Sequence, residues 1–177
     1  MPRRVALLGS INVGGNRLKM AELREALTDA GFANVETVVA SGNVLLDDDG
    51  SPAEAERRIV EVLADRFSIE TFAIVLDKAA LEAALAENPF AGEGADKLVH
   101  VHFLTAQPSA DQYARLLADH KGRGPERLAA GPRALHVDFV DGAGSSKLTG
   151  PFIERRLGCK GTARNLRSLQ RIIEKMD

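Results

Sequence analysis

The sequence predicts an α+β protein made of two tandem ferredoxin-like units, each a βαββαβ arrangement with an antiparallel sheet. Short apolar runs alternate with segments that repeat apolar residues at helical spacing, and the order seen in the first 77 residues recurs after residue 96. The chain has 177 residues and is 45% hydrophobic, which is enough for a core without disulfides. Its single cysteine, Cys159, excludes an intrachain disulfide and any zinc site built from several cysteines.

The first unit is predicted to span residues 1–77. Gly31 is a plausible helix stop, Pro52 suits the first position of a helix, and Ser41-Gly42-Asn43 reads as the turn of a hairpin. The sheet strands are apolar on both faces, so both faces are expected to be covered. The predicted elements are a strand at 3–8, a Gly-rich loop at 9–16, a helix ending near 31, strands at 35–40 and 44–46, a helix at 52–67 and a strand at 71–76.

A connecting helix and linker follow at 78–96, and the second unit is predicted at 97–163. Asn88-Pro89 ends the connecting helix, and Gly131-Pro132 marks the second hairpin. The predicted elements are a strand at 98–104, a helix capped by Ser109, a hairpin of 126–130 with 133–140, a helix at 151–157 and a short extended piece at 159–163. An amphipathic C-terminal helix is predicted over residues 164–177, from about Arg164 to Lys175.

Short motifs in both halves carry a family resemblance: Ile11-Asn12-Val13-Gly14-Gly15, Ser41-Gly42-Asn43-Val44, Ser146-Lys147-Leu148-Thr149 and Thr162-Ala163-Arg164-Asn165. In combination they resemble a widespread bacterial family classed only as a domain of unknown function, over essentially the whole chain. The resemblance implies the same tandem ferredoxin-like fold and no particular activity. Two positions depart from the family pattern, because Gly9-Ser10 stands where Arg-Gly is usual and Leu166 stands where an aromatic residue is usual.

Two Gly-rich loops are the candidate ligand-binding segments. The first lies between a strand and a helix, where backbone N–H groups favour an anion, but it lacks the Lys-Ser/Thr pair of a nucleotide P-loop. Its alternative interpretation is a crossover whose glycines adopt positive φ. The second, at 141–149, offers hydroxyls and an ammonium group, or else simply a capped helix start. The candidate ligand-binding residues are Asn12, Gly14, Gly15, Lys19, Ser41, Asn43, Ser146, Lys147, Thr149, Arg164 and Asn165.

The formal net charge of −2 hides a strong asymmetry along the chain. Residues 1–24 carry five basic and one acidic residue, residues 147–177 carry eight and three, and the middle is acidic. Within the last segment, Arg164, Arg167, Arg171 and Lys175 form a basic stripe at helical spacing, which is either a solvated face or a contact for an anion. The preferred hypothesis is therefore a protein that binds a phosphorylated small molecule, a nucleotide or a nucleic-acid backbone. No cofactor is clearly implied, and no catalytic residue is assigned.

Histidines supply an alternative hypothesis. His100 and His102 alternate with apolar residues on one predicted strand, and His136 and Asp138 do so on another. If these two strands pair at the centre of the sheet, all four side chains could share one face and form a metal or acid–base site. The competing interpretation is a half-polar sheet face without a site, because the register of the pair is unknown.

Whether the protein is an enzyme is left open by the sequence, and a protein–protein interaction module is the third hypothesis. The chain begins with no signal-peptide core and has no apolar stretch that approaches 18 residues, so no membrane span is expected and the cytoplasm is the default location. Few aromatic residues are present, which argues against base stacking on the sheet. A monomer or a homodimer is expected.

Overall fold

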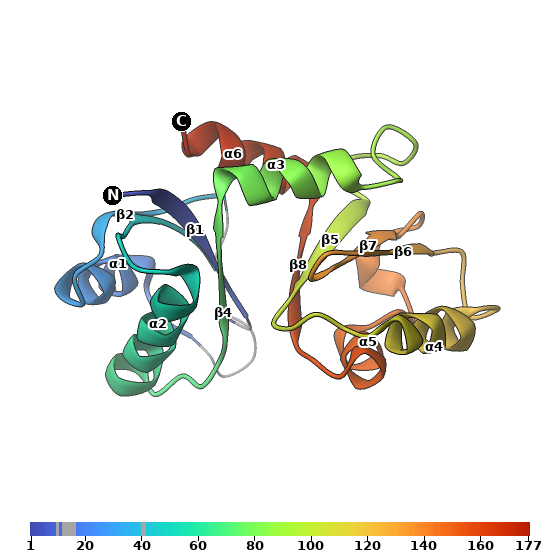
Figure 1. Cartoon of the computed structure of the whole chain (residues 1–177), viewed down its shortest axis with the longest axis horizontal. Coiled ribbons are helices and arrows are strands. Elements are labelled where there is room, and N and C mark those ends of the chain that lie inside the picture. Colours follow the sequence, from blue (N-terminus) through green and yellow to red (C-terminus); the bar gives the residue numbers. More distant parts are fainter. Residues whose placement is uncertain (10, 12–16, 40–41) are drawn as a thin grey trace. The chain divides into compact units, whose positions relative to one another are not determined.

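The computed structural model describes residues 1–9, 11, 17–39 and 42–177. It divides into two compact units (Figure 1). One unit consists of Met1–Glu82 together with Arg171–Asp177, and the other of Ala83–Gln170. Two helices cross this division: α3 (Lys78–Glu87), which follows the first sheet, and α6 (Leu166–Lys175), which ends the chain.

The first unit has the predicted ferredoxin-like topology. Its sheet order is β2-β3-β1-β4 and all pairs are antiparallel. The elements are β1 (Arg3–Leu8), α1 (Met20–Asp29), β2 (Ala33–Thr37), β3 (Asn43–Asp47), α2 (Pro52–Phe67) and β4 (Ala73–Asp77). Helix α2 begins as the sequence predicts, with Pro52 in its first turn and the Ser51 hydroxyl accepting a hydrogen bond from the Glu54 amide.

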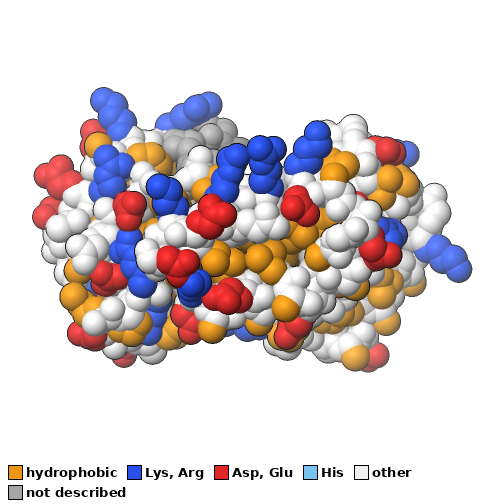
Figure 2. Space-filling view, turned by 90° about the horizontal axis from the view of Figure 1, so that it is seen from above, with side chains coloured by type: hydrophobic (Ala, Val, Ile, Leu, Met, Phe, Trp, Pro, Cys, Tyr) orange, Lys and Arg blue, Asp and Glu red, His pale blue; other side chains and the backbone are white. Residues whose placement is uncertain are grey.

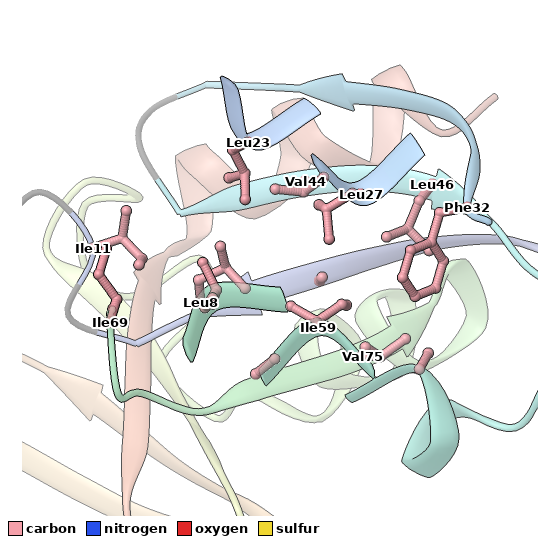
Figure 3. Packing of buried hydrophobic residues seen from close by; sticks show 14 residues of the cluster. Leu8, Ile11, Leu23, Leu27, Phe32, Val44, Leu46, Ile59, Ile69 and Val75 are labelled. Carbon is pink, nitrogen blue, oxygen red and sulfur yellow. The ribbon is translucent and has the colours of Figure 1, made fainter. Parts of the chain in front are cut away.

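Both faces of this sheet are buried along β1, β3 and β4, as predicted, whereas the edge strand β2 exposes Asn34 and Glu36. Ala6 and Leu8 face α1 and α2 and belong to the core drawn in Figure 3, where Leu23 and Leu27 of α1 and Ile59 of α2 pack on the strands. Val5 and Leu7 alternate with Ala6 and Leu8 along β1, so they point to the opposite face of the sheet. On that face Val5 lies opposite Leu76 and Leu7 opposite Ile74 of β4. Val5 and Leu7 are also fully buried. The sheet therefore has a second buried surface, on the face opposite α1 and α2.

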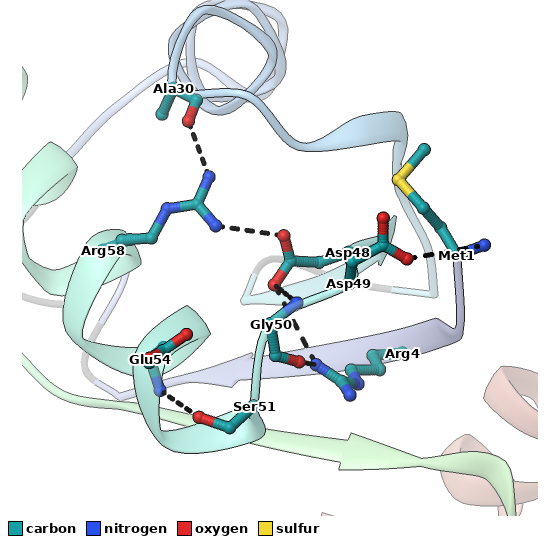
Figure 4. Close-up of polar contacts among 9 residues, drawn as sticks. All are labelled: Met1, Arg4, Ala30, Asp48, Asp49, Gly50, Ser51, Glu54 and Arg58. Carbon is teal, nitrogen blue, oxygen red and sulfur yellow. Dashed lines mark hydrogen bonds and ion pairs between the residues drawn. The ribbon is translucent and has the colours of Figure 1, made fainter.

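A polar network ties α2 to the strand ends of the first unit (Figure 4). The buried Asp48 carboxylate accepts hydrogen bonds from Arg58 at 3.0 Å and from the Gly50 amide at 3.2 Å. Arg4, which is also buried, lies 3.9 Å from the same carboxylate and donates to the Gly50 carbonyl. Two guanidinium groups thus neutralise one buried carboxylate, which is the condition for keeping such a charge inside a protein.

The second unit repeats the topology, with sheet order β6-β7-β5-β8. Its core lies between this sheet and helices α4 and α5. Helix α4 has the capping box that Ser109 suggests, since the Ser109 hydroxyl and the Gln112 side chain each bond the other's backbone amide. The elements are β5 (Val99–Leu104), α4 (Ala110–His120), β6 (Arg127–Gly131), β7 (Ala134–Asp138), a 3₁₀ turn (Ala143–Ser145), α5 (Gly150–Leu157) and β8 (Gly161–Asn165).

The end of the second unit differs from the sequence prediction. Strand β8 runs to Asn165, so Arg164 lies in the sheet and not on the C-terminal helix, which begins only at Leu166. The physical reason is pairing, because Arg164 lies opposite Val101 and completes the fourth strand of the sheet. Among the described residues, no helix is long and apolar enough to cross a membrane.

Candidate functional site

The first Gly-rich loop is only partly described by the structure. Asn12, Gly14, Gly15 and Ser41 lie outside the described residues. Lys19 is exposed at the N-cap position of α1, where its side chain makes no capping hydrogen bond. Asn43 begins β3, opposite Leu7, and its side chain is buried. The predicted anion site in this loop therefore remains a prediction.

In the second Gly-rich loop, two of the three predicted ligands, Ser146 and Thr149, make hydrogen bonds that stabilise the loop and the start of α5. Ser146 Oγ donates to the Glu126 carboxylate at 3.0 Å and accepts from the Leu148 amide at 3.0 Å. Thr149 Oγ1 accepts from the Phe152 amide at 3.3 Å and caps α5. Only Lys147 points its charge to solvent, and it has no ion-pair partner in the described part of the chain. The capped-helix interpretation of this loop therefore accounts for Ser146 and Thr149.

The two predicted ligands near the C-terminus have different surroundings. Asn165 Oδ1 accepts a hydrogen bond from the Ser168 amide at 2.8 Å, so this side chain caps α6. Arg164 is half-buried on β8 and donates to Thr162 Oγ1 at 2.6 Å and to the Ala163 carbonyl at 2.9 Å. Burial lowers the pKa of Arg164 to about 10, because desolvation disfavours its charged form. Even so, Arg164 carries its charge at neutral pH.

Helix α6 keeps the rest of the predicted basic stripe. Its apolar side is buried through Leu166, Leu169 and Ile172. Arg167, Arg171 and Lys175 recur every four residues on the opposite, exposed side, and we call these three residues the α6 cation row. Within the described ranges, none of the three side chains forms an ion pair or a hydrogen bond. The row is therefore a set of positive charges without an ion pair in the described residues, and Glu174 is the one acidic residue on the same helix.

Acidic side chains near the ends of α6 are engaged elsewhere. Asp177, two residues beyond the row, pairs with Lys78. Asp96 accepts a hydrogen bond from Gln170, and its backbone carbonyl accepts from the Arg167 amide. On the face drawn in Figure 2, Lys and Arg side chains stand out in separate groups with Asp and Glu among them. On this face the positive charge is therefore divided into local groups and does not form one continuous basic surface.

The prediction that four polar side chains share one sheet face is wrong. In the register of β5 and β7, Val101 lies opposite His136 and His100 lies opposite Val137. Opposed residues of an antiparallel pair point to the same face, so His136 and Asp138 are on one face and His100 and His102 on the other. A shift by one residue moves every side chain of a strand to the opposite face, and the sequence alternates in the same way for both registers.

The histidines instead are half-buried (His100 and His102) or buried (His136), and their surroundings disfavour the charged form. The His100 ring packs edge-on against Phe139 at a centroid distance of 4.8 Å, on the core side of the sheet. Burial lowers the pKa of His102 to about 4 and also lowers the pKa values of His100 and His136. Asp138 is paired with Arg127 at 2.6 Å. In the part of the chain that the structure describes, no group of three or more His, Cys, Asp or Glu residues is arranged to hold a metal ion.

One polar cluster was not found by sequence reasoning. His120, at the end of α4, and Glu126, just before β6, both have buried side chains and lie 3.6 Å apart, between His120 Nε2 and Glu126 Oε1. The Glu126 carboxylate also accepts a hydrogen bond from Ser146, which the sequence singled out for a different reason. His120 and Glu126 carry no recognisable motif, because only the packing of a helix end on a strand start brings them together.

Comparisons with known proteins agree with this architecture. A family model described as a protein of unknown function (DUF1697) matches residues 1–136 of the chain. Among solved structures, a conserved bacterial protein from Streptococcus pneumoniae, SP0830, matches with a TM-score of 0.72 and 22% sequence identity, over 99% of this chain and 98% of its own. At that identity the likeness shows the fold alone. The comparison with curated proteins returned no match.

Proposed function

The chain belongs to the DUF1697 family of proteins of unknown function, and from the side chains of the chain itself we propose that it binds a ligand carrying several phosphate groups. The observation that carries the proposal is the α6 cation row, which is exposed and has no acidic partner in the described residues. Like charges four residues apart on a helix repel each other, and an anion that contacts the row relieves this repulsion.

The spacing of the α6 cation row favours an extended ligand. Arg167 and Lys175 are eight residues apart, and a helix rises about 1.5 Å per residue, so the row is about 12 Å long. Along one strand of B-DNA the phosphates follow at about 3.4 Å of axial rise, so the row is matched in length by about three or four of them. A single phosphate contacts only part of the row. The ligand class is therefore a nucleic-acid backbone or a nucleotide with an oligophosphate chain.

Recognition is expected to depend on phosphates and not on bases. The whole chain contains no tryptophan and one tyrosine, Tyr113, which is buried, and all seven phenylalanines are buried or half-buried. Base stacking by aromatic side chains is the usual source of affinity for unpaired bases. Without it, binding should be nearly independent of nucleotide sequence and strongly dependent on salt.

The test measures the binding of a fluorescein-labelled single-stranded DNA 12-mer to the full chain by fluorescence anisotropy, from 50 to 300 mM salt. For about three phosphate contacts, the logarithm of the affinity should fall against the logarithm of salt with a slope of about −2. A triple variant, Arg167→Gln, Arg171→Gln and Lys175→Gln, should bind at least about tenfold more weakly. Unlabelled ATP and inorganic phosphate, added as competitors, distinguish an oligophosphate from a single phosphate.

A matched control removes three exposed cations that already have acidic partners. Arg57, Arg66 and Arg115 pair with Glu61, Asp29 and Asp119. Changing these three arginines to Gln lowers the net charge by the same amount and should leave the affinity nearly unchanged. Equal losses in the two triple variants would mean that only overall charge matters, and that result contradicts the proposal. Lys147→Gln, measured alongside, reports whether the second Gly-rich loop also contacts the ligand.

A further inference from the structure

The second unit contains a line of three polar side chains away from the α6 cation row. Ser146 Oγ donates to Glu126 Oε2 at 3.0 Å, and Glu126 Oε1 lies 3.6 Å from His120 Nε2. The side chains of Glu126 and His120 are only 5% and 8% exposed, whereas Ser146 is half-buried at the surface end of the line. A serine hydroxyl therefore donates a hydrogen bond to a buried carboxylate, and a buried histidine lies beside that carboxylate.

Hydrogen bonding assigns the tautomer of this histidine. His120 Nε2 lies 3.0 Å from the backbone carbonyl oxygen of Glu126. A carbonyl oxygen only accepts, so Nε2 carries the proton. Glu126 Oε1 lies 3.6 Å from the same nitrogen, which is beyond hydrogen-bond distance, so His120 fixes the backbone of Glu126 and contacts its carboxylate only as a close polar neighbour. His120 positions Glu126 and does not itself reach Ser146.

Two buried atoms in this line lack hydrogen-bond partners: Glu126 Oε1 and His120 Nδ1. Leaving a carboxylate oxygen buried without a donor costs free energy, so its burial beside a serine hydroxyl calls for a physical explanation. For Ser146 a structural role exists, because it accepts from the Leu148 amide. That role accounts for the hydroxyl but not for a buried carboxylate placed to take its proton.

We propose that Ser146 is a nucleophile activated by Glu126 as general base, with His120 as the positioning residue, and that the substrate class is a carboxylic ester. A nucleophile and a base within hydrogen-bond distance, with the base oriented by a third group, is the arrangement that activates a serine hydroxyl. The amide of Leu148 adds to this, because a donor to Oγ stabilises the oxygen as it loses its proton.

Ester hydrolysis at Ser146 proceeds through an acyl group held on the serine oxygen. Ser146 Oγ attacks the carbonyl carbon of the ester while its proton moves to Glu126. The C–O bond to the alcohol then breaks, the alcohol leaves with the proton from Glu126, and an acyl group remains on Ser146. Water attacks this acyl group, gives a proton to Glu126, and releases the acid as Ser146 takes the proton back. No metal or redox partner takes part.

Positive charge lies next to the nucleophile in the chain. Lys147 is exposed, and α5 begins at Gly150, whose amide has no acceptor within the helix. A cation and a helix N-terminus both stabilise the negative oxygen that forms during attack on an ester. Lys147 is therefore expected to affect the rate of attack more than the affinity for substrate.

The test uses the full chain and a fluorophosphonate probe. Attack by Ser146 Oγ on the probe forms an O–P bond, breaks the P–F bond and releases fluoride, with the proton passing to Glu126. Peptide mapping by mass spectrometry should place the adduct on Ser146. With p-nitrophenyl acetate, the protein should release a burst of about one equivalent of p-nitrophenolate.

Ser145 is the matched control, because it is exposed and directly precedes Ser146. Ser145→Ala should label at the wild-type rate, Ser146→Ala should not label, and Glu126→Gln should label about a hundredfold more slowly. His120→Gln keeps an N–H donor and should preserve labelling, whereas His120→Leu should slow it and shift its pH profile. Thermal unfolding identifies any variant that fails to fold. Absence of an adduct on Ser146 in the wild-type protein overturns the proposal whatever the variants do.

Discussion

Arg58 on α2 donates one hydrogen bond to the Asp48 carboxylate at 3.0 Å and a second to the Ala30 carbonyl at 2.7 Å. Its guanidinium also lies over the Phe32 ring, 4.1 Å from the centroid. One side chain thus joins three segments of the first unit. Replacing it removes the main partner of a buried carboxylate. We expect Arg58→Ala to lower the free energy of unfolding by about 2–4 kcal/mol, measured by urea denaturation.

The neighbouring Arg57 is a natural control for this variant. It is exposed and pairs only with Glu61, one helical turn away. An exposed pair of this kind contributes about 0.5 kcal/mol or less. If Arg57→Ala and Arg58→Ala destabilise the protein equally, the network around Asp48 contributes no more stability than an exposed ion pair.

His102 is expected to make the protein less stable in acid. Burial lowers its folded-state pKa to about 4, whereas an unfolded histidine titrates near 6.5. Below pH 6.5 the unfolded chain binds a proton that the folded chain rejects until pH 4. The contribution of uncharged His102 to the free energy of unfolding is therefore complete above about pH 6.5 and is lost as the pH falls toward 4. Between pH 7 and pH 5 this single group should cost about 2 kcal/mol.

The measurement compares urea denaturation at pH 7 and pH 5 for the wild type and for His102→Gln. The variant does not titrate, so its stability should fall less over this range, whatever its absolute stability. Because burial lowers the pKa values of His100 and His136 in the same direction, part of the decline should persist in the variant. Identical pH dependence in the two proteins is the result that contradicts the prediction.

Thr149 separates the two interpretations of the second Gly-rich loop. Its hydroxyl caps α5 by accepting from the Phe152 amide. Thr149→Ala should therefore lower stability by about 1 kcal/mol, and Thr149→Ser should restore most of that loss. Neither variant should change the anisotropy of the DNA 12-mer titration. A large loss of DNA affinity at unchanged stability would instead make Thr149 a ligand.

Cys159 is expected to react slowly. It is half-buried, burial raises the pKa of its thiol, and Sγ lies 3.8 Å from the Ala106 carbonyl. Only the thiolate is nucleophilic. Alkylation by iodoacetamide at pH 8 should therefore be several-fold slower than that of free cysteine, and should reach the free rate in denaturing urea. Equal rates without urea would show that the thiol is open to solvent.

Much of the fold could be predicted because local signals agree with tertiary packing. Ser51-Pro52 and Ser109 start helices through local hydrogen bonds that need no distant partner. The apolar residues on both sides of β1 require burial on both faces. The second strand, predicted at 35–40, lies at Ala33–Thr37, and the predicted C-terminal helix begins two residues late. Such boundaries depend on which residues find a partner strand, as Arg164 does opposite Val101.

The site was harder to predict, because hydroxyls and amides serve caps and ligands equally well. Ser146, Thr149 and Asn165 were sensible ligand candidates by residue type, yet each bonds a backbone amide nearby. Whether Lys19 or Lys147 also contacts a ligand is not decided by any contact in the structure, so these two stay predictions. Only the exposure of Arg167, Arg171 and Lys175 follows directly from the apolar period of α6.

The sequence by itself determined the class of fold, the order of the elements and the amphipathic character of the last helix, because each is encoded in spacing along the chain. The tertiary structure alone decided which face each histidine of the second sheet occupies, because register is a relation between two strands. It also decided that the Glu126 side chain lies beside both His120 and Ser146, since these residues come from the end of α4, the loop before β6 and the loop before α5, and only packing brings their side chains together.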